Sequence, residues 1–303
     1  MLFRSINDIL KINCCVIFFM SNISIAVAVT GANSFVGKSL RKFLHKNKVN
    51  VLGISRKNFG KHSTETKVQS KNLQEQQLQK KLKNYDVLVH LIGIGREVPK
   101  STFEEINVNL TKNAIRTCKN AGIKKIIYIS GLGVSKNSTS SYFASKYRAE
   151  REIINSGLDY TIFRASYIIG KTDHLTKSLS KQVKKGTIII PGSGRYRLQP
   201  IFVEDVAKII LEAILEKKFS NKILDLVGPQ KISFEDFVKL FSKNMKVKFK
   251  KLNLDDAYEE STYSSESLDI LIGDHISNVN HLQKLTNVKL TAVEKFLQTS
   301  SLS

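Results

Sequence analysis

The sequence predicts an α/β fold built on a doubly wound parallel sheet, and three observations predict it. Apolar runs such as Ile23–Thr30 and Asp86–Ile92 lack alternating polar residues, which is typical of strands covered on both faces. Amphipathic segments of helical length separate these runs along the first 165 residues. A chain of 303 residues is also long enough to bury a large core. Repeated strand–helix units of this kind indicate parallel strands joined by helical crossovers.

The elements follow in chain order. Strands are expected at Ile23–Thr30, Val49–Ile54, Asp86–Ile92, Lys125–Ser130 and Tyr160–Arg164, and helices at Phe35–Lys46, within the polar stretch 66–84, at Phe103–Ala121 and at Tyr142–Ser156. Beyond 170 the pattern is less regular, with helices at 174–185, Val203–Leu215 and Ser233–Phe241, a loop at 191–194 and a short strand at Ile223–Val227. We therefore expect an α/β domain over 20–170. A smaller, interwoven C-terminal α+β lobe over 171–303 follows, from which about 200–228 returns to the sheet.

Residues 1–19 precede Met20 and the first strand. Their apolar stretch Cys14–Met20 is too short and too weakly flanked for a signal peptide. Two interpretations stay open for this extension: a start site placed one methionine too early, or a segment that touches a membrane from one side.

The net charge of +22 comes from 48 Lys and Arg against 26 Asp and Glu. The lysines are scattered and form no basic block interleaved with aromatic residues, so nucleic acid is an unlikely partner. Residues 252–283 reverse the pattern, with seven acidic residues and no Lys or Arg. A solvated lysine-rich surface and peripheral contact with an anionic membrane both remain open.

Cysteine and histidine usage excludes two classes of protein. Three cysteines, two of them adjacent, cannot form a disulfide framework, which favours a reducing compartment and a cytoplasmic location, peripheral to the membrane if the surface binds one. The six histidines are dispersed without metal-ligand spacing, so we predict no metal site. His90 lies inside an apolar strand, where a hydrogen-bonded core histidine is expected.

A glycine-containing turn, Thr30-Gly-Ala-Asn-Ser-Phe-Val-Gly37, joins the first strand to the first helix. Glycine at the strand end allows a tight turn, and the helix then presents free N–H groups to a pyrophosphate. Ser34 stands where a dinucleotide fingerprint has its middle glycine, and its side chain narrows the phosphate approach. The turn predicts these dinucleotide-binding residues: Gly31, Asn33, Ser34, Phe35, Val36 and Gly37.

The end of the second strand indicates which dinucleotide is bound. An acidic residue there would accept the ribose hydroxyls of NAD, but this sequence has Ser55-Arg56. Arg56 offers a charge-assisted fork to a 2′-phosphate, with Ser55 as a further donor. The sequence therefore favours NADP(H) over NAD(H), while a merely solvated cation is the simpler alternative for Arg56.

Several longer motifs now point to a family. They are His90-Leu-Ile-Gly-Ile-Gly-Arg-Glu97, Phe103-Glu-Glu-Ile-Asn107, Tyr128-Ile-Ser-Gly-Leu-Gly133, Tyr142-Phe-Ala-Ser-Lys146, Leu158-Asp-Tyr-Thr-Ile-Phe-Arg164 and Gly194–Val206. In this order they resemble the atypical short-chain dehydrogenase/reductases of the NAD-dependent epimerase/dehydratase type, over roughly 23–243. The group that looks most similar is the NAD(P)H-binding accessory subunit of respiratory complex I with its prokaryotic relatives. The resemblance implies a Rossmann-type sheet and adds Leu91, Ile92 and Gly93 to the cofactor-binding residues.

The resemblance also implies catalytic residues. Tyr142 and Lys146 stand four apart, hence on one face of a helix. In short-chain reductases the Lys lowers the pKa of the Tyr and holds the nicotinamide ribose, while the phenol exchanges a proton with the substrate. A Ser or Thr usually orients the carbonyl at the end of the preceding strand. Here Ser130 is the candidate, while Gly131 occupies the second position of the usual pair.

Other polar residues in these motifs have two interpretations each. Asn107 either bonds the backbone near the site or caps and packs its helix. Arg195 and Arg197 either grip an anionic substrate or headgroup beside the cleft, or stand at the surface without a ligand.

Two main functions follow from these features, beside a third, a nucleotide-sugar epimerase, which fits the turn Thr30–Gly37 well and the block at 194–206 less well. The first is an NADP(H)-dependent oxidoreductase or epimerase/dehydratase-like enzyme acting on an unidentified small molecule, supported by Tyr142 and Lys146. The second is a non-catalytic NADP(H)-binding module of a larger protein complex, supported by Ser34, Gly131 and the resemblance.

Overall fold

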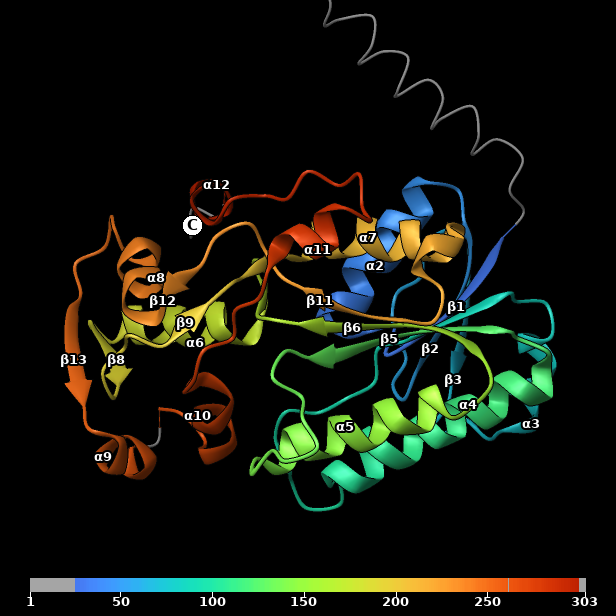
Figure 1. The fold of residues 1–303 in the computed structure, drawn as a ribbon, viewed down its shortest axis with the longest axis horizontal. Coiled ribbons are helices and arrows are strands. Elements are labelled where there is room, and N and C mark those ends of the chain that lie inside the picture. Colours follow the sequence, from blue (N-terminus) through green and yellow to red (C-terminus); the bar gives the residue numbers. More distant parts are fainter. Residues whose placement is uncertain (1–24, 261, 300–303) are drawn as a thin grey trace, which may run out of the picture.

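A seven-stranded parallel sheet lies at the centre of the molecule, which is known from a computed structural model that describes residues 25–260 and 262–299 (Figure 1). In spatial order the strands are β11 (Lys222–Leu226), β6 (Asp159–Ala165), β5 (Lys125–Gly131), β4 (Val87–His90), β1 (Ala26–Thr30), β2 (Asn50–Ser55) and β3 (Glu65–Gln69). All six strand pairs are parallel. The predicted doubly wound α/β fold is confirmed.

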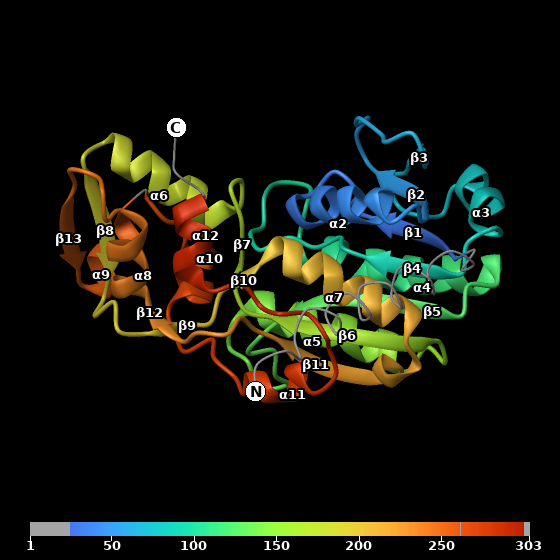
Figure 2. The same cartoon turned by 90° about the horizontal axis from the view of Figure 1, so that it is seen from above.

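Helices cover both faces of this sheet (Figures 1 and 2). One face carries α2 (Phe35–Lys46), α7 (Val203–Leu215) and α11 (Val279–Gln283), and the other carries α3 (Gln76–Leu82), α4 (Leu110–Ala121) and α5 (Ser141–Ile154). Each face has its own apolar core, and the inner strands β1 and β4 are buried along their whole length. Burial on both faces explains why their sequences are continuously apolar.

The strand order creates one crevice at the carboxyl edge of the sheet, and a ligand is expected there. The chain runs from β1 outward through β2 to β3 and then returns to β4 on the other side of β1. Crossover helices therefore leave the carboxyl ends of β1 and β4 on opposite faces, and ligands of open α/β sheets bind in the crevice formed there.

The remaining elements form a smaller lobe beside the sheet, at the left of Figure 1. Its helices are α6 (His174–Lys184), α8 (Phe234–Phe241), α9 (Leu254–Glu259), α10 (Ser265–Leu271) and α12 (Val293–Thr299), and the short 3₁₀ helix η3 (Lys217–Phe219) follows α7. Its two-stranded sheets pair β8 (Thr187–Pro191) with β13 (Lys248–Leu252), and β9 (Arg197–Leu198) with β12 (Ile232–Ser233); β7 (Ile168–Ile169) pairs with β10 (Ile201–Phe202) beside the main sheet. A third apolar core fills this lobe.

Two elements of the sheet domain differ from those expected. The stretch 66–84 holds the expected helix, α3, but an unpredicted strand, β3, precedes it at the sheet edge. The inward-facing residues of β3 include Glu65, whose carboxylate pairs with Arg41. Because this buried residue is charged, the sequence of β3 shows no apolar pattern typical of a strand. The segment expected as one helix, Phe103–Ala121, begins with the π-helix η2 (Glu104–Asn109).

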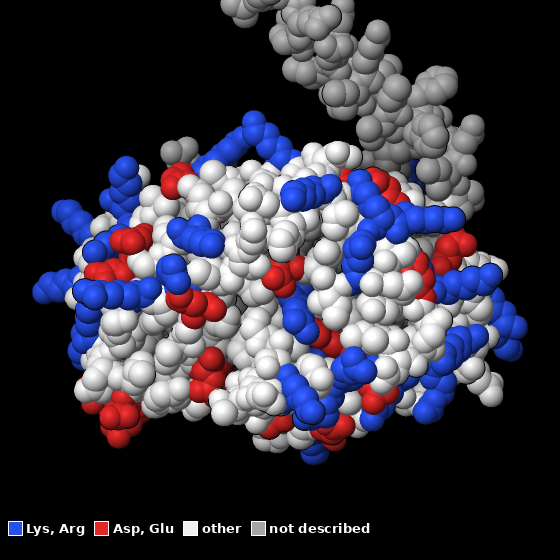
Figure 3. Space-filling model, in the orientation of Figure 1, with Lys and Arg blue, Asp and Glu red and all other residues white. Residues whose placement is uncertain are grey.

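The surface charge is dispersed, as Figure 3 shows for one face. Basic side chains are scattered over this view among uncharged residues, with a group at the left end over α8 and β13, and acidic residues gather near α9. Within the described residues, no helix is long and apolar enough to cross a membrane. The predicted extension 1–19 lies outside the described residues.

Candidate functional site

The turn after β1 is as tight as its glycines predict. Gly31 has φ +66°, and a Cβ there would lie 3.0 Å from the carbonyl carbon and oxygen of Leu91. A Cβ on Gly37 would lie 2.3 Å from the carbonyl oxygen of Gly31. Neither backbone position has room to move away, so both positions require glycine.

Ser34 is the N-cap of α2. Its hydroxyl accepts a hydrogen bond from the Gly37 amide at 3.0 Å, and its own amide donates to the Gly31 carbonyl. The serine oxygen therefore satisfies one N–H group of the first turn. The amides of Phe35 and Val36 have no acceptor within the described part of the chain and stand at the positive end of the helix dipole. This arrangement suits an anion such as a pyrophosphate.

A chain of hydrogen bonds beneath the turn fixes the ends of β1 and β4. The Leu91 amide donates to the Thr30 hydroxyl, whose oxygen lies 2.8 Å from His90 Nδ1. His90 Nε2 lies 3.2 Å from the Thr111 hydroxyl, which donates to the Asn107 carbonyl. Burial and the Lys146 charge lower the pKa of His90 to about 3, so the ring is neutral. His90 is the hydrogen-bonded core histidine that its apolar strand predicts.

Arg41, which the sequence did not single out, joins three segments at the other end of the turn. Its guanidinium pairs with buried Glu65 at 2.7 Å and donates to the carbonyl oxygens of Ala32 and Gly60. The same group lies 4.5 Å from the centre of the Phe59 ring. Arg41 thus fixes the loop that follows β2, while Arg56 in that loop is exposed. The described residues offer Arg56 no hydrogen bond or ion pair. The only sequence signal for Arg41 was its position as an arginine on the face of a helix that is otherwise apolar and buried.

A cleft of about 370 Å³ begins at the turn and runs across the carboxyl edge of the sheet. Nine of its lining residues were predicted for the site: Ser34, Phe35, Val36, Leu91, Ile92, Gly93, Ser130, Tyr142 and Lys146. Ile94, Gly95, Ile129 and His174 line it as well and were not predicted. Gly31, Asn33, Gly37, Ser55 and Arg56 do not line the cleft, although the two glycines shape its floor through the turn.

Asn107 holds the far wall of this cleft. Its side-chain oxygen accepts from the Ile94 amide at 2.8 Å, and its nitrogen donates to the Ile94 carbonyl and to the Ser145 hydroxyl. Asn107 lies in η2, and π-helical turns frequently occur at functional sites because they redirect a side chain. The interpretation that Asn107 bonds backbone near the site is confirmed.

Tyr142, Lys146 and Glu150 follow one another along one face of α5. The Lys146 ammonium donates to the Ile129 carbonyl at 2.8 Å and lies 4.2 Å from the centre of the Tyr128 ring. Buried Glu150 pairs with Arg164 at 2.6 Å. Burial lowers the pKa of Lys146 to about 7, although Glu150 acts in the opposite direction. Burial also raises the pKa of Tyr142 to about 12, so its phenol carries a proton at neutral pH.

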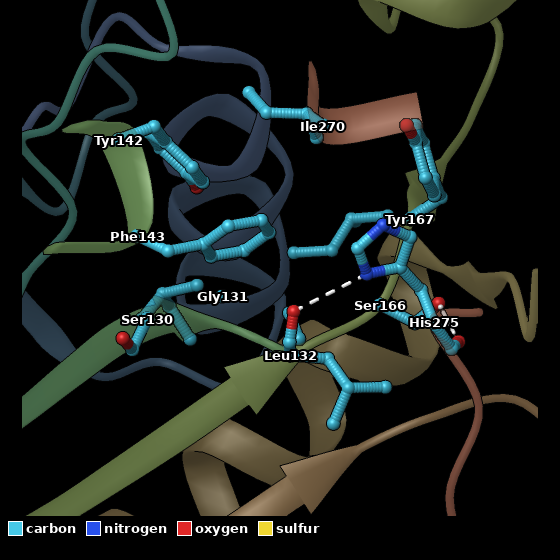
Figure 4. Close-up of a pocket in the computed structure, with 12 residues that line it drawn as sticks. Ser130, Gly131, Leu132, Tyr142, Phe143, Ser166, Tyr167, Ile270 and His275 are labelled. Carbon is cyan, nitrogen blue, oxygen red and sulfur yellow. Dashed lines mark hydrogen bonds between the residues drawn. The ribbon is translucent and has the colours of Figure 1, made fainter. Parts of the chain in front are cut away.

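A second cavity of about 250 Å³ adjoins the cleft, and Ile129, Ser130 and Tyr142 line both (Figure 4). The Tyr142 hydroxyl points into it. A Cβ on Gly131 would lie 3.4 Å from this hydroxyl and 3.2 Å from the Phe143 ring. Gly131 therefore occupies the position where a serine hydroxyl would meet Tyr142. The buried Ser130 hydroxyl has no hydrogen-bond partner in the described part of the chain and is turned away from Tyr142 in Figure 4.

His275 enters this cavity from the smaller lobe. The sequence placed it in the acidic stretch 252–283, far from any motif, and gave no signal for it. Its amide donates to the Arg197 carbonyl, and its carbonyl accepts from the Ser166 hydroxyl. Arg197, a candidate for gripping an anion, is instead paired with Asp274, to which its amide also donates at 2.7 Å. Arg195 is exposed.

The geometry fits a dinucleotide. A Cβ does not fit at Gly31 or Gly37, two helix amides are left for an anion, and the cleft leads from them to Lys146 and Tyr142. Gly93 belongs to this path, because a Cβ there would lie 3.4 Å from the Lys146 nitrogen. Within the described residues, no group of three His, Cys, Asp or Glu side chains could hold a metal ion.

Comparisons with known proteins agree with this geometry. The chain is 33% identical over 147 residues to NADH dehydrogenase (ubiquinone) 1 alpha subcomplex subunit 9, mitochondrial, from Arabidopsis thaliana, covering 48% of this chain and 37% of that protein. It is 23% identical over 256 residues to the subunit of the same name from Dictyostelium discoideum, covering 80% and 70%. The chain thus matches well under half the length of the first relative.

Among solved structures, UDP-glucuronic acid 4-epimerase from Bacillus cereus in complex with NAD superimposes with a TM-score of 0.65 at 19% identity, covering 82% of this chain and 95% of that one. At this identity the likeness shows the shared fold. The sequence model of the NAD dependent epimerase/dehydratase family matches residues 27–226. This protein therefore belongs to the NAD dependent epimerase/dehydratase family.

Proposed function

We propose that this protein is an NADP(H)-dependent oxidoreductase that acts on a small carbonyl or alcohol. The observation that carries the proposal is the position of Tyr142, which lines both the dinucleotide cleft and the adjoining cavity. A group that transfers a proton to a substrate must reach the substrate beside the cofactor, and Tyr142 meets that requirement.

The roles follow from the protonation states. A bound dinucleotide supplies or accepts the hydride. The phenol of Tyr142 keeps its proton at neutral pH and can donate it to a substrate oxygen in the reducing direction. Lys146 is held between the Ile129 carbonyl and the Tyr128 ring, from which its ammonium can turn to a ribose hydroxyl at the Gly93 wall.

The choice of NADP(H) rests on Arg56. Arg56 is exposed at the carboxyl end of β2, where an acidic residue would favour NAD(H), and Arg41 holds the loop that carries it. Replacement Arg56→Ala should weaken NADPH binding by about 10- to 100-fold, because charge-assisted hydrogen bonds contribute ~1.5–3 kcal/mol, and leave NADH binding unchanged. Nucleotide fluorescence titration measures both affinities. The neighbouring exposed cation gives the control, Lys57→Ala, and equal affinity of the unaltered protein for NADH and NADPH would refute the preference.

Turnover is tested with Tyr142→Phe. This variant should bind NADPH as the wild type does and lose about 10²–10⁴-fold in the rate of NADPH oxidation with carbonyl substrates, the range for a lost general acid. Unchanged turnover in the variant would remove Tyr142 from the mechanism.

A second candidate function is a non-catalytic NADP(H)-binding module of a larger complex. Gly131 favours it, since the hydroxyl that would orient a carbonyl beside Tyr142 is missing, and two curated relatives are named as subunits of NADH dehydrogenase. This candidate predicts NADPH binding without turnover on any carbonyl. It includes peripheral contact with an anionic membrane through the basic surface.

Replacement Gly131→Ser examines the second candidate directly. A serine there requires the Phe143 ring to move by a few tenths of an ångström and adds a hydroxyl next to that of Tyr142. If the missing hydroxyl limits catalysis, the variant should oxidise NADPH faster than the wild type in the presence of carbonyls at unchanged NADPH affinity. A variant as inert as the wild type would favour the module.

A further inference from the structure

The cavity beside Tyr142 has a chemical character of its own. The polar residues that line it are Ser130, Tyr142, Ser166, Tyr167 and His275, and the Ser166 hydroxyl already donates to the His275 carbonyl. The other lining residues are apolar or glycine, and no described Lys, Arg, Asp or Glu lines the cavity. Its volume of about 250 Å³ lies below the ~300–1,000 Å³ of pockets for drug-sized ligands. An ionic ligand would therefore lose its hydration without gaining a counter-charge.

Two arginines that adjoin lining residues, one in the chain and one through a backbone hydrogen bond to His275, are already paired. Arg197 binds Asp274, the residue before His275, through both its side chain and its amide. Arg164, one residue before Ala165 in the lining, binds buried Glu150. Neither guanidinium is free for a diphosphate, so the lining does not suit a nucleoside-diphosphate sugar.

His275 has one polar atom without a partner. The residue is 8% exposed, and its Nδ1 lies 3.3 Å from the Leu132 carbonyl, which can only accept. The proton of the neutral ring is therefore on Nδ1, and Nε2 carries a lone pair. This Nε2 is buried and makes no hydrogen bond with the described residues, although the Ile270 carbonyl is close enough to the ring to influence its pKa. Burial lowers the pKa of His275, although the carbonyls of Ile270 and Leu132 and the Asp274 carboxylate oppose this, so the neutral form is favoured.

Tyr142 and His275 form opposite sides of the cavity. Figure 4 shows the Tyr142 hydroxyl at one side and the imidazole at the other, with Nε2 turned away from Leu132 toward the space below Ile270. The Phe143 ring lies between them, with its centre 5.0 Å from that of Tyr142 and 5.8 Å from that of His275. One side can donate a hydrogen bond from a phenol, and the other can accept one at Nε2.

We propose that this cavity binds a small, uncharged hydroxycarbonyl compound, whose carbonyl oxygen accepts from Tyr142 and whose hydroxyl donates to His275 Nε2. The inference rests on the proposed function and adds the substrate class to it. His275 selects the substrate through the second oxygen and takes no part in hydride transfer. The redox balance is that of the proposed reaction: NADPH supplies the hydride, the protein the proton, and the product is a diol.

The experiment separates this inference from the proposed function. NADPH binding is measured first by its fluorescence, because its absence would overturn the proposed function itself. Protein loaded with NADP⁺ is then titrated by calorimetry with 2-hydroxycyclohexanone, cyclohexanone, pyruvate and UDP-glucose. We expect the hydroxyketone to bind on the order of tenfold more tightly than the ketone that lacks the hydroxyl, and the two anions not to bind.

Two variants locate the effect. His275→Phe keeps an aromatic ring against Phe143 and should abolish the tenfold preference without changing NADPH affinity. His281→Phe makes the same substitution at an exposed histidine of α11 and should keep the preference. In the wild type, the ¹⁵N resonance of His275 Nε2 should shift when the hydroxyketone binds. Three results would overturn the inference while NADPH binding is intact. They are the absence of hydroxyketone binding, tighter binding of UDP-glucose than of the hydroxyketone, and a preference for the hydroxyketone that survives in His275→Phe.

Discussion

At the scale of single residues, the site depends on positions where one added atom or one lost charge changes ligand binding or the stability of the fold. Gly31 has a backbone conformation that other residues rarely adopt, and it also lies against the Leu91 carbonyl. Gly122 shares the conformation, with φ +79°, but a Cβ there would meet nothing within 4 Å. Substitutions at Gly31 and Gly122 therefore separate the cost of the backbone conformation from the cost of a steric clash between the added Cβ and Leu91.

Gly122→Ala should lower the free energy of unfolding by about 1 kcal/mol, the penalty of a left-handed conformation, and Gly31→Ala should lower it further, because its Cβ also meets the Leu91 carbonyl. Only Gly31→Ala should also weaken NADPH binding, by tenfold or more, because its Cβ pushes the turn away from Leu91. Urea unfolding and fluorescence titration measure the two effects. Normal NADPH affinity in Gly31→Ala would mean that the dinucleotide binds elsewhere.

Lys146 predicts a pH dependence of stability. Its pKa is about 7 in the folded protein and near 10.5 when unfolded, so between these values the unfolded chain holds the extra proton. The free energy of unfolding then rises with pH through this window, by up to ~1.4 kcal/mol per pH unit. Lys146→Met should lack this rise, so wild type should gain stability relative to the variant from pH 7 to pH 9 in urea unfolding. Lys119→Met, at an exposed site of α4, should run parallel to wild type. Parallel curves for Lys146→Met would show that Lys146 titrates normally.

At the scale of elements, one buried ion pair connects the segments around the turn after β1. Arg41 on α2 ties the phosphate turn, the loop after β2 and the edge strand β3 into one unit. Glu65 also accepts from the His62 amide, so its carboxylate stabilises the loop from the opposite side. This buried pair thus helps to anchor the loop that carries the exposed Arg56.

Arg41→Met should therefore lower the free energy of unfolding by about 3–5 kcal/mol, since it leaves the Glu65 carboxylate buried without a counter-charge. Adding Glu65→Leu should recover part of the loss, because two apolar groups replace a buried pair at little cost. The exposed neighbour provides the control, Lys42→Met. Thermal unfolding measures all four proteins, and a loss below 1 kcal/mol in Arg41→Met would show that the pair contributes little.

At the scale of the whole molecule, the basic charge is dispersed, and one group of lysines lies at the end of the smaller lobe. The edge strand β13 and the turn before it present exposed Lys246, Lys248 and Lys250 beside Phe249, which is 42% exposed. Acidic residues of α9 follow directly in the chain. We propose that this end of the molecule makes the peripheral membrane contact.

The protein should then adsorb to phosphatidylglycerol vesicles at low salt and dissociate at about 0.5 M NaCl, where screening shortens the range of the attraction. Changing the three lysines to glutamine should abolish most of this adsorption. The same change at Lys80, Lys81 and Lys83 near α3 should reduce it only slightly. Vesicle co-sedimentation gives the measurement, and adsorption to neutral phosphatidylcholine vesicles would contradict an electrostatic contact.

The sequence by itself determined the sheet, its helices, the phosphate turn and the Tyr142–Lys146 face. Each of these depends on local signals: continuous apolar runs for strands buried on both faces, glycines where no Cβ fits, and a spacing of four along a helix. The tertiary structure alone decided that Glu65 makes β3 an inward-facing strand, that Asn107 bonds Ile94, and that His275 reaches the cavity beside Tyr142. These contacts join residues distant in the chain, and their polar side chains are stable inside only because a partner from another element meets them. The periodicity of a sequence does not indicate which residue of another element will form such a hydrogen bond or ion pair.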